Sequence, residues 1–527
     1  MYTQWTLDYP RLHDMAVELD KRCNDRIAFE QDFRGQVRRL TFHEVLRDTE
    51  DLSAAFAQRF CKKPVALLCR GSVEFFLVFL ACVYSGSVVV PIDCDATDEE
   101  TLREIVDSES TAVFYSAATE KKIERIALPE QVERFKVEDT LDNLTQEGRT
   151  LEKPDFDALD PDRFCALFYT SGTTGRGKGV MLSDRNLACV ACQAGCHVDV
   201  YQSVLSVLPA HHTYGSVCGV LAIYGLGDTV YFTQGLKTFM TDLKKFKPTN
   251  LFLVPMFLTT MQKMIWQTAQ KSGKDKLLRR MLKVSDALLK VKIDLRRVFF
   301  KSVIDAFGGN LKTITSGGAP IEAQLQREFE RFGIQVLNGY GITECSPLVA
   351  VNISKQNRHG TVGKALPYCT IRIENPDEEG LGEVCVKGDN VMLGYYKDEQ
   401  ATAQVLKDGW FNTGDIGHLD EQGYLFITGR KKDMIVLPSG ENVYPEPIET
   451  QFYRLDYVKD AVVYLDRQSG QLTVQVLFED EADTSSFEAD LKAINRSLPP
   501  YMRVQKTIIR TEEFEKTSTK KIKRFAI

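Results

Sequence analysis

The chain has 527 residues and a net charge of −7, and 43% of its residues are hydrophobic and 26% charged. This length and composition indicate a globular protein with more than one domain. The acidic balance argues against non-specific nucleic-acid binding as its main role, so we expect no nucleic-acid partner.

Residues 1–14 contain no basic region followed by an apolar core, so we expect no secretory signal. The 13 cysteines are odd in number and lie mostly in apolar surroundings, which is typical of reduced thiols in a cytosolic protein. We therefore predict a cytoplasmic location. The apolar stretch 75–90 is broken by Ser85-Gly86-Ser87 and is shorter than the roughly 20 residues that a membrane span needs. We expect a buried helix and then a buried strand there.

Helix and strand patterns alternate between residues 28 and 116. The predicted elements, in order, are a strand at 65–69, a helix at 73–84, a strand at 88–92, a helix at 101–106 and a strand at 112–115. Strands that alternate with helices imply a parallel sheet covered on both faces. The polar and acidic residues 117–160 are expected to form an excursion on the surface.

A buried strand is predicted at Phe164–Tyr169, and it ends in a loop rich in glycine and hydroxyl side chains. Backbone N–H groups, hydroxyls and a lysine in such a loop can wrap a polyphosphate. The candidate phosphate ligands are Thr170, Ser171, Gly172, Thr173, Thr174, Gly175 and Lys178. Gly179 follows Lys178 where the Walker pattern has Ser or Thr, which argues against a Walker-type ATPase. Taken alone, the loop also fits a solvated connection between two elements.

A helix is predicted at 187–196 and a short strand at 204–208. His211 and His212 follow this strand. Adjacent histidines can bind a metal, but no carboxylate or thiol at ligand spacing accompanies this pair. The pattern alone therefore predicts no metal site there.

A strand predicted at 251–255 precedes the segment 271–301, which is dense in Lys and Arg. Only Asp275, Asp286 and Asp294 offset these charges, and apolar residues recur at helical spacing. A basic amphipathic helix can lie on an anionic membrane surface, so a peripheral membrane contact is one interpretation of this pattern, although such a helix is more often simply solvated. A solvated helix that packs by its apolar stripe is the alternative.

Two further strand ends, near 316 and 337, carry small or polar residues. They lead into Gly317-Gly318-Ala319-Pro320 and Asn338-Gly339-Tyr340-Gly341-Ile342-Thr343-Glu344-Cys345-Ser346-Pro347. Small residues allow the backbone to approach a flat ligand closely. Tyr340 can offer its ring face to adenine, and Thr343 can offer a hydroxyl to a phosphate. Glu344 supplies the hard oxygen that Mg²⁺ prefers.

The last motifs lie in the final quarter of the chain. They are Gly409-Trp410-Phe411-Asn412-Thr413-Gly414-Asp415, Tyr424-Leu425-Phe426-Ile427-Thr428-Gly429-Arg430-Lys431-Lys432-Asp433 and the basic segment 516–524. Residues 434–527 read as a small α+β unit, with a hairpin at 460–465 and 472–478, a helix at 487–498 and a strand at 504–510. As isolated residues, the charges in these motifs would be ordinary surface charges.

These motifs, in this order, resemble the signatures of the adenylate-forming enzymes, which include acyl-CoA synthetases, adenylation domains and luciferases. Gly177 departs from the pattern where the family most often has Pro, and Lys520 departs where Gly is typical. The resemblance implies an α/β fold. Its large N-terminal domain, 1–431, has mostly parallel sheets flanked by helices, and a small mobile α+β C-terminal domain covers 432–527.

The resemblance also implies roles for individual residues. Besides the phosphate loop, the ATP or AMP site takes Gly318, Ala319, Pro320, Asn338, Gly339, Tyr340, Gly341, Thr343, Asp415, Ile427 and Arg430. The acyl pocket takes His212, Tyr214, Gly215, Gly317 and Gly318, although His212 also fits a surface turn. The catalytic residues are Lys521, Thr343, Glu344 and His212, with Glu344 as the Mg²⁺ ligand and Lys520 as the alternative to Lys521. Lys432 is the hinge, and Gly440 belongs to a loop that lines the thiol's access path.

The implied reaction joins a carboxylic acid to a thiol at the expense of ATP and needs Mg²⁺. The acid first forms acyl-adenylate and pyrophosphate, and coenzyme A then takes the acyl group. The motif at 337–352 and the basic segment before it look most like those of long-chain fatty acyl-CoA synthetases. The segment is shorter than usual, so a medium-chain or aryl acid stays open, as does an acyl carrier protein in place of coenzyme A. A catalytically inactive nucleotide-binding or membrane-docking protein is the rival from another class.

Overall fold

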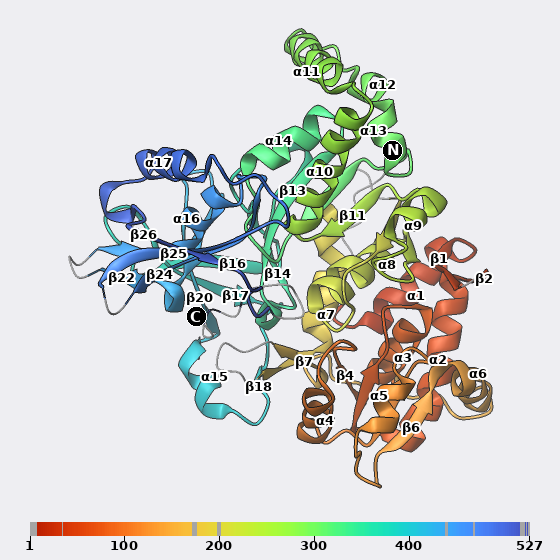
Figure 1. Ribbon diagram of the computed structural model, residues 1–527. Helices are drawn as coiled ribbons and strands as arrows, with labels where there is room; N and C mark the ends of the chain where they lie inside the picture. The colour runs from red at the N-terminus through yellow and green to blue at the C-terminus, as the bar shows by residue number, and fades with distance from the viewer. Residues whose placement is uncertain are drawn as a thin grey trace. The chain divides into compact units, whose positions relative to one another are not determined.

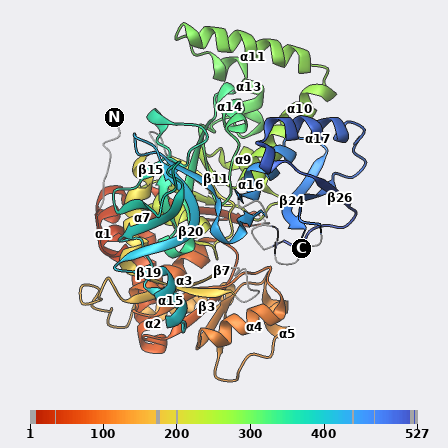
Figure 2. The same ribbon diagram turned by 90° about the vertical axis from the view of Figure 1, so that its left-hand side faces the viewer.

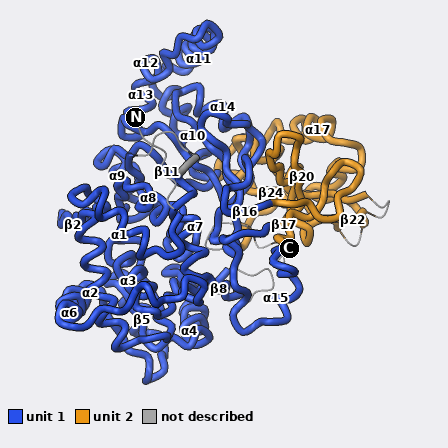
Figure 3. The backbone as a smooth tube through the Cα atoms, turned by 180° about the vertical axis from the view of Figure 1, so that it is seen from behind, with its two compact units in different colours: residues 1–170, 178–370, 386–411 blue, residues 171–177, 371–385, 412–527 orange. Residues whose placement is uncertain are grey.

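The computed structural model describes residues 8–33, 35–170, 177–197, 202–437, 441–466, 469–516, 522 and 524 (Figure 1). The chain forms two compact units. Unit 1 comprises residues 1–170, 178–370 and 386–411, and unit 2 comprises residues 171–177, 371–385 and 412–527 (Figure 3). The domain boundary at 431/432 and the mobility of the C-terminal domain stay predictions.

The first sheet of unit 1 carries the ends of the predicted phosphate loop. In sheet order its strands are β18 (Gly394–Tyr395), β8 (Lys178–Ser183), β7 (Phe164–Thr170), β4 (Val88–Pro91), β3 (Pro64–Leu68), β5 (Ala112–Tyr115) and β6 (Glu133–Lys136). The strands from β7 to β6 run parallel, whereas β8 and β18 add antiparallel pairs at one edge. The predicted parallel sheet is confirmed.

The second sheet of unit 1 carries the small-residue strand ends. In sheet order its strands are β15 (Lys364–Ala365), β14 (Leu348–Val351), β13 (Gln335–Gly341), β12 (Thr313–Ser316), β11 (Asn250–Leu253), β9 (Ser203–Ser206), β10 (Thr229–Phe232), β1 (Ile27–Phe33) and β2 (Gln36–Thr41). Its central strands, from β13 to β1, run parallel, and its edges are antiparallel. Parallel strands end at the same sheet edge, so β12 and β13 bring their carboxyl ends together.

Helix α3 (Val73–Tyr84) packs against β1 of the second sheet and against β3, β4 and β7 of the first. It therefore lies between two sheets, which explains why it is apolar all round and buried at every position except Glu74. The expected buried helix followed by a buried strand is confirmed by α3 and β4. Among the described residues, no helix is both long and apolar enough to cross a membrane.

The other helices of unit 1 flank the sheets. They are α1 (Leu12–Cys23), α2 (Phe42–Phe60), α4 (Asp98–Asp107), α5 (Glu120–Arg125), α6 (Val137–Gly148), α7 (Asp184–Gln193), α8 (Ala222–Gly225), α9 (Phe239–Phe246), α10 (Pro255–Lys271), α11 (Asp275–Lys290), α12 (Arg296–Phe299), α13 (Lys301–Ala306), α14 (Ala323–Arg331) and α15 (Glu399–Val405), with short turns at Ala194–His197, Thr343–Cys345 and Ser354–Gln356 and a π-helix, η2, at Tyr214–Leu221. Capping boxes start α2 and α4, where Thr41 pairs with Glu44 and Thr97 with Glu100.

A five-stranded sheet and a small α+β sheet complete the fold. The five strands are β16 (Cys369–Glu374), β17 (Gly382–Gly388), β20 (Trp410–Leu419), β19 (Leu406–Lys407) and β21 (Leu425–Arg430), and the later elements are β22 (Ile435–Val436), β23 (Asn442–Val443), α16 (Pro445–Phe452), β24 (Val458–Asp466), β25 (Gln471–Phe478), α17 (Phe487–Ser497), the turn Pro500–Met502 and β26 (Lys506–Arg510). Strands β24 and β25 form the predicted hairpin, and β26 adds a parallel strand to it. The predicted fold class, mostly parallel α/β with a small α+β part, is confirmed.

Candidate active site

Strands β7 and β8 hold the two ends of the predicted phosphate loop. Thr170 pairs with Lys178 across this antiparallel hairpin, and the Thr170 hydroxyl donates to the Lys178 carbonyl at 3.3 Å. The predicted ligands Ser171, Gly172, Thr173, Thr174 and Gly175 lie outside the described residues. The hairpin therefore fixes where the loop leaves and re-enters the sheet, and it places Lys178 at the start of β8, the strand next to the edge strand β18.

A buried tyrosine connects the loop end to the carboxylate predicted to bind magnesium. Tyr395, on β18, donates its hydroxyl to Glu344 Oε1 at 2.8 Å. The ammonium of Lys178 lies 4.5 Å from the centre of the Tyr395 ring, a cation–π contact. Glu344 is 9% exposed, so its carboxylate is held in one orientation at little contact with bulk water. A single oriented carboxylate fits Mg²⁺, which keeps several waters and takes one or two protein carboxylates.

The motif around Tyr340 is a tight turn between two strands. Strand β13 ends at Gly341, and Thr343 and Glu344 follow in a single 3₁₀ turn. A Cβ on Gly341 would lie 2.5 Å from the Pro347 carbonyl oxygen, so no other residue fits without moving the backbone. This contact explains why glycine stands next to the two predicted ligands.

Two buried polar atoms meet at the carboxyl ends of β12 and β13. Ser316 and Asn338 are paired in register on these strands. Ser316 Oγ and Asn338 Oδ1 have no hydrogen-bond partner among the described residues, although Asn338 Nδ2 donates to the Thr361 carbonyl at 3.0 Å. Buried groups without partners cost free energy unless a ligand or water satisfies them. An amine-bearing ring such as adenine fits an acceptor of this kind.

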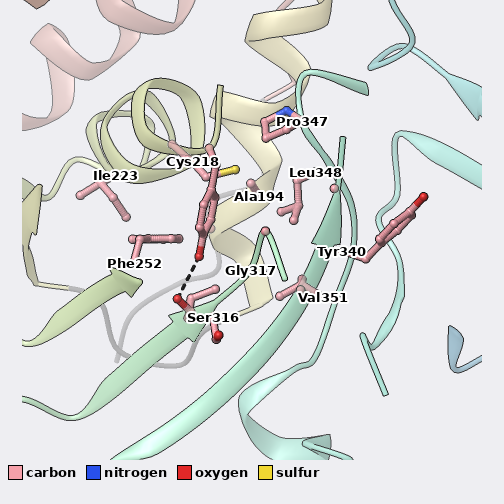
Figure 4. A pocket seen from close by; sticks show the side chains of 17 residues that line it. Ala194, Cys218, Ile223, Phe252, Ser316, Gly317, Tyr340, Pro347, Leu348 and Val351 are labelled. Atoms are coloured by element: carbon pink, nitrogen blue, oxygen red, sulfur yellow. Dashed lines mark hydrogen bonds between the residues drawn. The ribbon is translucent and has the colours of Figure 1, made fainter. Parts of the chain in front are cut away.

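An apolar cavity lies beside these strand ends. Its lining is Ala194, Gly195, Tyr214, Cys218, Ala222, Ile223, Phe252, Thr315, Ser316, Gly317, Gly318, Gly339, Tyr340, Gly341, Pro347, Leu348 and Val351. Figure 4 shows Cys218, Ile223, Phe252, Ala194 and Leu348 around the cavity, whereas the Tyr340 ring points away from it. The cavity can therefore take an apolar group on one side of β13. The Tyr340 ring lies on the opposite side of the strand and is available to a second group there (Figure 4).

Tyr214 opens the π-helix η2 and shapes one wall of the cavity. Its hydroxyl donates to the Thr315 carbonyl at 2.9 Å. A Cβ on Gly317 would lie 3.1 Å from the Tyr214 ring, so the ring and the glycine backbone are in close contact. π-Helices are rare in proteins, and those that do occur are often found at functional sites. The structure thus brings together Tyr214, Gly317 and Gly318 of the predicted acyl pocket.

The other predicted pocket residues lie just outside this lining. Gly215 packs against the chain before it, because a Cβ there would meet the Pro209 carbonyl oxygen at 2.2 Å. His212 Nε2 lies 3.1 Å from His211 Nε2, and His211 Nε2 is also 3.4 Å from Asp93 Oδ2. Burial and the nearby Arg70 charge lower the pKa of His211 to about 4. His211 is therefore neutral near pH 7.

In unit 2, strands β20 and β21 place the predicted ribose ligand. Asp415 and Arg430 are paired in register, and Arg430 Nε lies 2.7 Å from Asp415 Oδ1. Asp415 is buried, and its backbone N–H donates to the Thr413 hydroxyl at 3.0 Å. Ile427 is half-buried on β21, and Lys432 is exposed in the turn that follows. Lys521 and Gly440 lie outside the described residues.

The remaining predicted nucleotide ligands, Ala319 and Pro320, are exposed just after Gly318 in unit 1.

Two residues of this site, Tyr395 and Ser316, are not among those that the sequence indicates. Tyr395 lies far along the chain from Glu344, and only the pairing of β18 with β8 brings it near Lys178. The Gly394-Tyr395 dipeptide is too common a pattern to have indicated this role. Ser316 was visible as a polar residue at a strand end, which is a usable signal in parallel sheets.

Comparisons with known proteins agree with these motifs. The family model described as AMP-binding enzyme matches residues 17–396. A long-chain-fatty-acid–CoA ligase of Mycobacterium bovis is 32% identical over 423 residues, which cover 74% of this chain and 69% of the relative. Indoleacetate–CoA ligase of Aromatoleum aromaticum is 28% identical over 496 residues, which cover 90% and 88%.

The fold has matches among solved structures. O-succinylbenzoate coenzyme A synthetase of Bacillus subtilis, solved in complex with AMP, aligns with a TM-score of 0.75 at 22% identity over 97% of both chains. Such a likeness supports the fold. The family match and the 32% identical relative show that the chain belongs to the AMP-binding enzymes, the adenylate-forming family that the sequence motifs predicted. Within that family its sequence is similar to fatty acyl-CoA synthetases.

Proposed function

We propose that the chain is an AMP-forming ligase that activates a long-chain fatty acid with Mg·ATP and transfers the acyl group to coenzyme A. The observation that carries this proposal is the apolar cavity beside Gly317 and Gly341. It adjoins unpartnered polar atoms of Ser316 and Asn338, which fit a nucleotide base. The long-chain-fatty-acid–CoA ligase among the relatives supports a fatty acid as the substrate.

The reaction needs no protein nucleophile. The substrate carboxylate attacks the α-phosphorus of ATP and pyrophosphate leaves, after which the thiol attacks the acyl carbon and AMP leaves. Catalysis then depends on positioning and on stabilising the charge that develops. Bound Mg²⁺, held by Glu344, would supply positive charge to the phosphates.

Each proposed ligand has a distinct task. Thr173, Thr174 and Lys178 hold the departing pyrophosphate, and Thr343 holds the α-phosphate. Asp415 accepts hydrogen bonds from the ribose hydroxyls, because each carboxylate oxygen can take one O–H donor. Arg430 Nε, 2.7 Å from Asp415 Oδ1, holds that carboxylate in a fixed orientation.

An aryl acid is the second candidate substrate. The indoleacetate–CoA ligase among the relatives covers more of this chain than the fatty-acid ligase does. The Tyr214 and Phe252 rings in the cavity wall, 6.1 Å apart between centroids, suit a flat aromatic group. A carrier-protein phosphopantetheine thiol would use the same residues as coenzyme A.

The test is pyrophosphate release with Mg·ATP and a panel of acids of rising chain length plus aryl acids, with and without coenzyme A. We expect AMP and pyrophosphate to form with long-chain acids and to form faster with coenzyme A. Turnover with aryl acids alone would assign the second candidate. Turnover that coenzyme A does not accelerate would point to a carrier protein. If no acid supports turnover, the inactive nucleotide-binding alternative holds.

The role of Lys521 is tested by separating the two half-reactions. Lys521→Ala is expected to slow adenylation by about 10²–10³-fold, because a preorganised donor to the developing charge is lost. Transfer from supplied acyl-adenylate to coenzyme A should fall much less. Lys520→Ala is the matched control and should leave adenylation near the unmodified rate. Equal losses in both halves would contradict the assignment.

A further inference from the structure

Helix α11 presents an unusual outer surface. Figures 1 and 2 both show α11 and α12 at the edge of unit 1, and α11 packs against α10 and α14. The surrounding segment, 271–301, holds eleven Lys or Arg residues and three Asp in a chain whose net charge is −7. This local excess of positive charge is therefore opposite in sign to the charge of the whole protein.

The inner side of α11 accounts for its attachment to the unit. Leu282 is buried in the core beneath the helix, and Leu278 packs against the same core. The Arg279 guanidinium lies 4.5 Å from the centre of the Trp266 ring. Arg331 forms a bidentate ion pair with Asp286, in which Nη2 donates to Oδ2 at 2.7 Å and Nε to Oδ1 at 3.1 Å. These contacts use the apolar residues and charges that face inward.

The outer side carries apolar residues that stay more than half exposed. Leu277 and Val284 lie seven residues apart on one side of the helix, and Val291, the C-cap residue directly after Lys290, continues the same spacing. Their exposed fractions are 53%, 52% and 64%. A row of exposed aliphatic side chains on one helix face is uncommon on a protein surface that meets only water. Ile293 and Val298, in the turn and short helix that follow, are exposed as well.

A row of lysines runs beside this apolar row. Lys276, Lys283 and Lys290 also recur every seven residues, one position before each apolar residue, and Arg280 lies between the two rows. None of these four cations forms an ion pair with any residue that the structure describes. Their charges remain available to an external anionic surface, and their long stems can bend toward it.

We propose that the outer face of α11, defined by Leu277, Val284, Val291 and the lysine row, docks the protein on an anionic lipid surface. An apolar row beside a lysine row is the arrangement by which a helix lies in the plane of a membrane interface. The aliphatic side chains enter the boundary between headgroups and acyl chains while the lysines contact anionic headgroups. The contact is peripheral and reversible, because it uses one helix face.

The test measures co-sedimentation of the full-length protein with phosphatidylcholine vesicles that contain either no phosphatidylglycerol or about 30% of it. We expect binding to the anionic vesicles, weaker binding at high salt and little binding to neutral vesicles. Replacing Lys276, Lys283 and Lys290 by Gln should weaken binding by about 100-fold, because each lysine near such a surface contributes about fivefold. The double variant Val284→Glu/Val291→Glu should abolish it, because it places acidic groups in the apolar row.

Two matched controls distinguish vesicle binding by the α11 face from effects of overall charge or of exposed hydrophobic residues elsewhere on the protein. The first replaces three exposed lysines elsewhere, Lys62, Lys121 and Lys237, by Gln, and the second is Leu236→Glu at another exposed aliphatic residue. Both should bind vesicles like the unmodified protein, and thermal unfolding of all variants should be unchanged.

Vesicle binding that the α11 variants leave intact would overturn the proposal, as would equal binding to neutral vesicles. A dimer in sedimentation velocity that Val284→Glu/Val291→Glu dissociates would make the face a contact between copies of this chain instead. Because the readout is binding, the result is independent of the proposed ligase activity.

Discussion

At the scale of single residues, Tyr395 links the predicted phosphate loop to the predicted metal ligand. Its hydroxyl fixes one oxygen of the buried Glu344 carboxylate, and its ring faces the Lys178 ammonium. A hydrogen bond to a charged group contributes about 1.5–3 kcal/mol. We therefore expect Tyr395→Phe to raise the Mg²⁺ concentration for half-maximal pyrophosphate exchange by about tenfold, because the carboxylate loses its fixed orientation.

The control for this prediction is Tyr396→Phe, at the residue that directly follows strand β18. The Tyr396 ring contacts Lys397 and Phe164, and its substitution should leave the Mg²⁺ requirement unchanged. A fall in maximal rate with an unchanged Mg²⁺ requirement in Tyr395→Phe would mean that the tyrosine acts through Lys178 and not through Glu344.

The candidate residues that the sequence indicated lie in contiguous motifs, whereas Tyr395, which it did not indicate, is brought in by tertiary structure. Thr343 and Glu344 follow a strand end within one short motif, and Asp415 and Arg430 each lie in a recognisable block. Tyr395 joins Glu344 only because β18 pairs with β8. Short-range patterns contain no information about that pairing.

At the scale of elements, the turn from β13 to β14 sets the geometry around Thr343 and Glu344. Because a Cβ on Gly341 would meet the Pro347 carbonyl at 2.5 Å, Gly341→Ala must displace this turn. We expect the apparent melting temperature to fall, with a destabilisation of about 2 kcal/mol or more, and pyrophosphate exchange to fall with it.

Gly339→Ala is the matched variant in the same strand. A Cβ on Gly339 has its nearest neighbours at 3.4 Å, an ordinary contact distance, so thermal stability should be retained. Any loss of exchange by Gly339→Ala at full stability would then report close approach of a ligand to that backbone. An unchanged melting temperature for Gly341→Ala would contradict the steric argument.

Element prediction succeeded where periodicity was strong and failed where elements were short or amphipathic. The strand and helix pattern of 65–115 was found because each run is apolar and bounded by turn residues. Residues 117–160 are expected from the sequence to form a surface excursion, and no helix or strand is predicted within it. They form α5, the edge strand β6 and α6, which packs on α2 through Val137, Leu141 and Leu144. Strand β8 was also missed, because its apolar run is only Val180–Leu182.

At the scale of the whole molecule, alternating strands and helices predicted parallel sheets, but not that two sheets share α3. The full apolar surface of α3 indicated burial, yet which strands bury it depends on contacts distant in sequence. The sequence likewise placed a hinge at Lys432 through the family resemblance and not through any local pattern. In the structure this residue is exposed, in a short turn directly after β21.

The hinge hypothesis makes a whole-molecule prediction, because the family resemblance implies that the C-terminal domain rotates about Lys432 between the two half-reactions. Proline fixes its own φ and restricts the residue before it, so Lys432→Pro should oppose such a rotation. We expect pyrophosphate exchange to stay near the unmodified rate and transfer from acyl-adenylate to coenzyme A to fall by about 100-fold, since misplaced groups lose their orientation advantage. Lys432→Ala keeps the backbone free and should retain both halves. Equal loss in both halves, or retention of both by Lys432→Pro, would show that this residue is not the hinge.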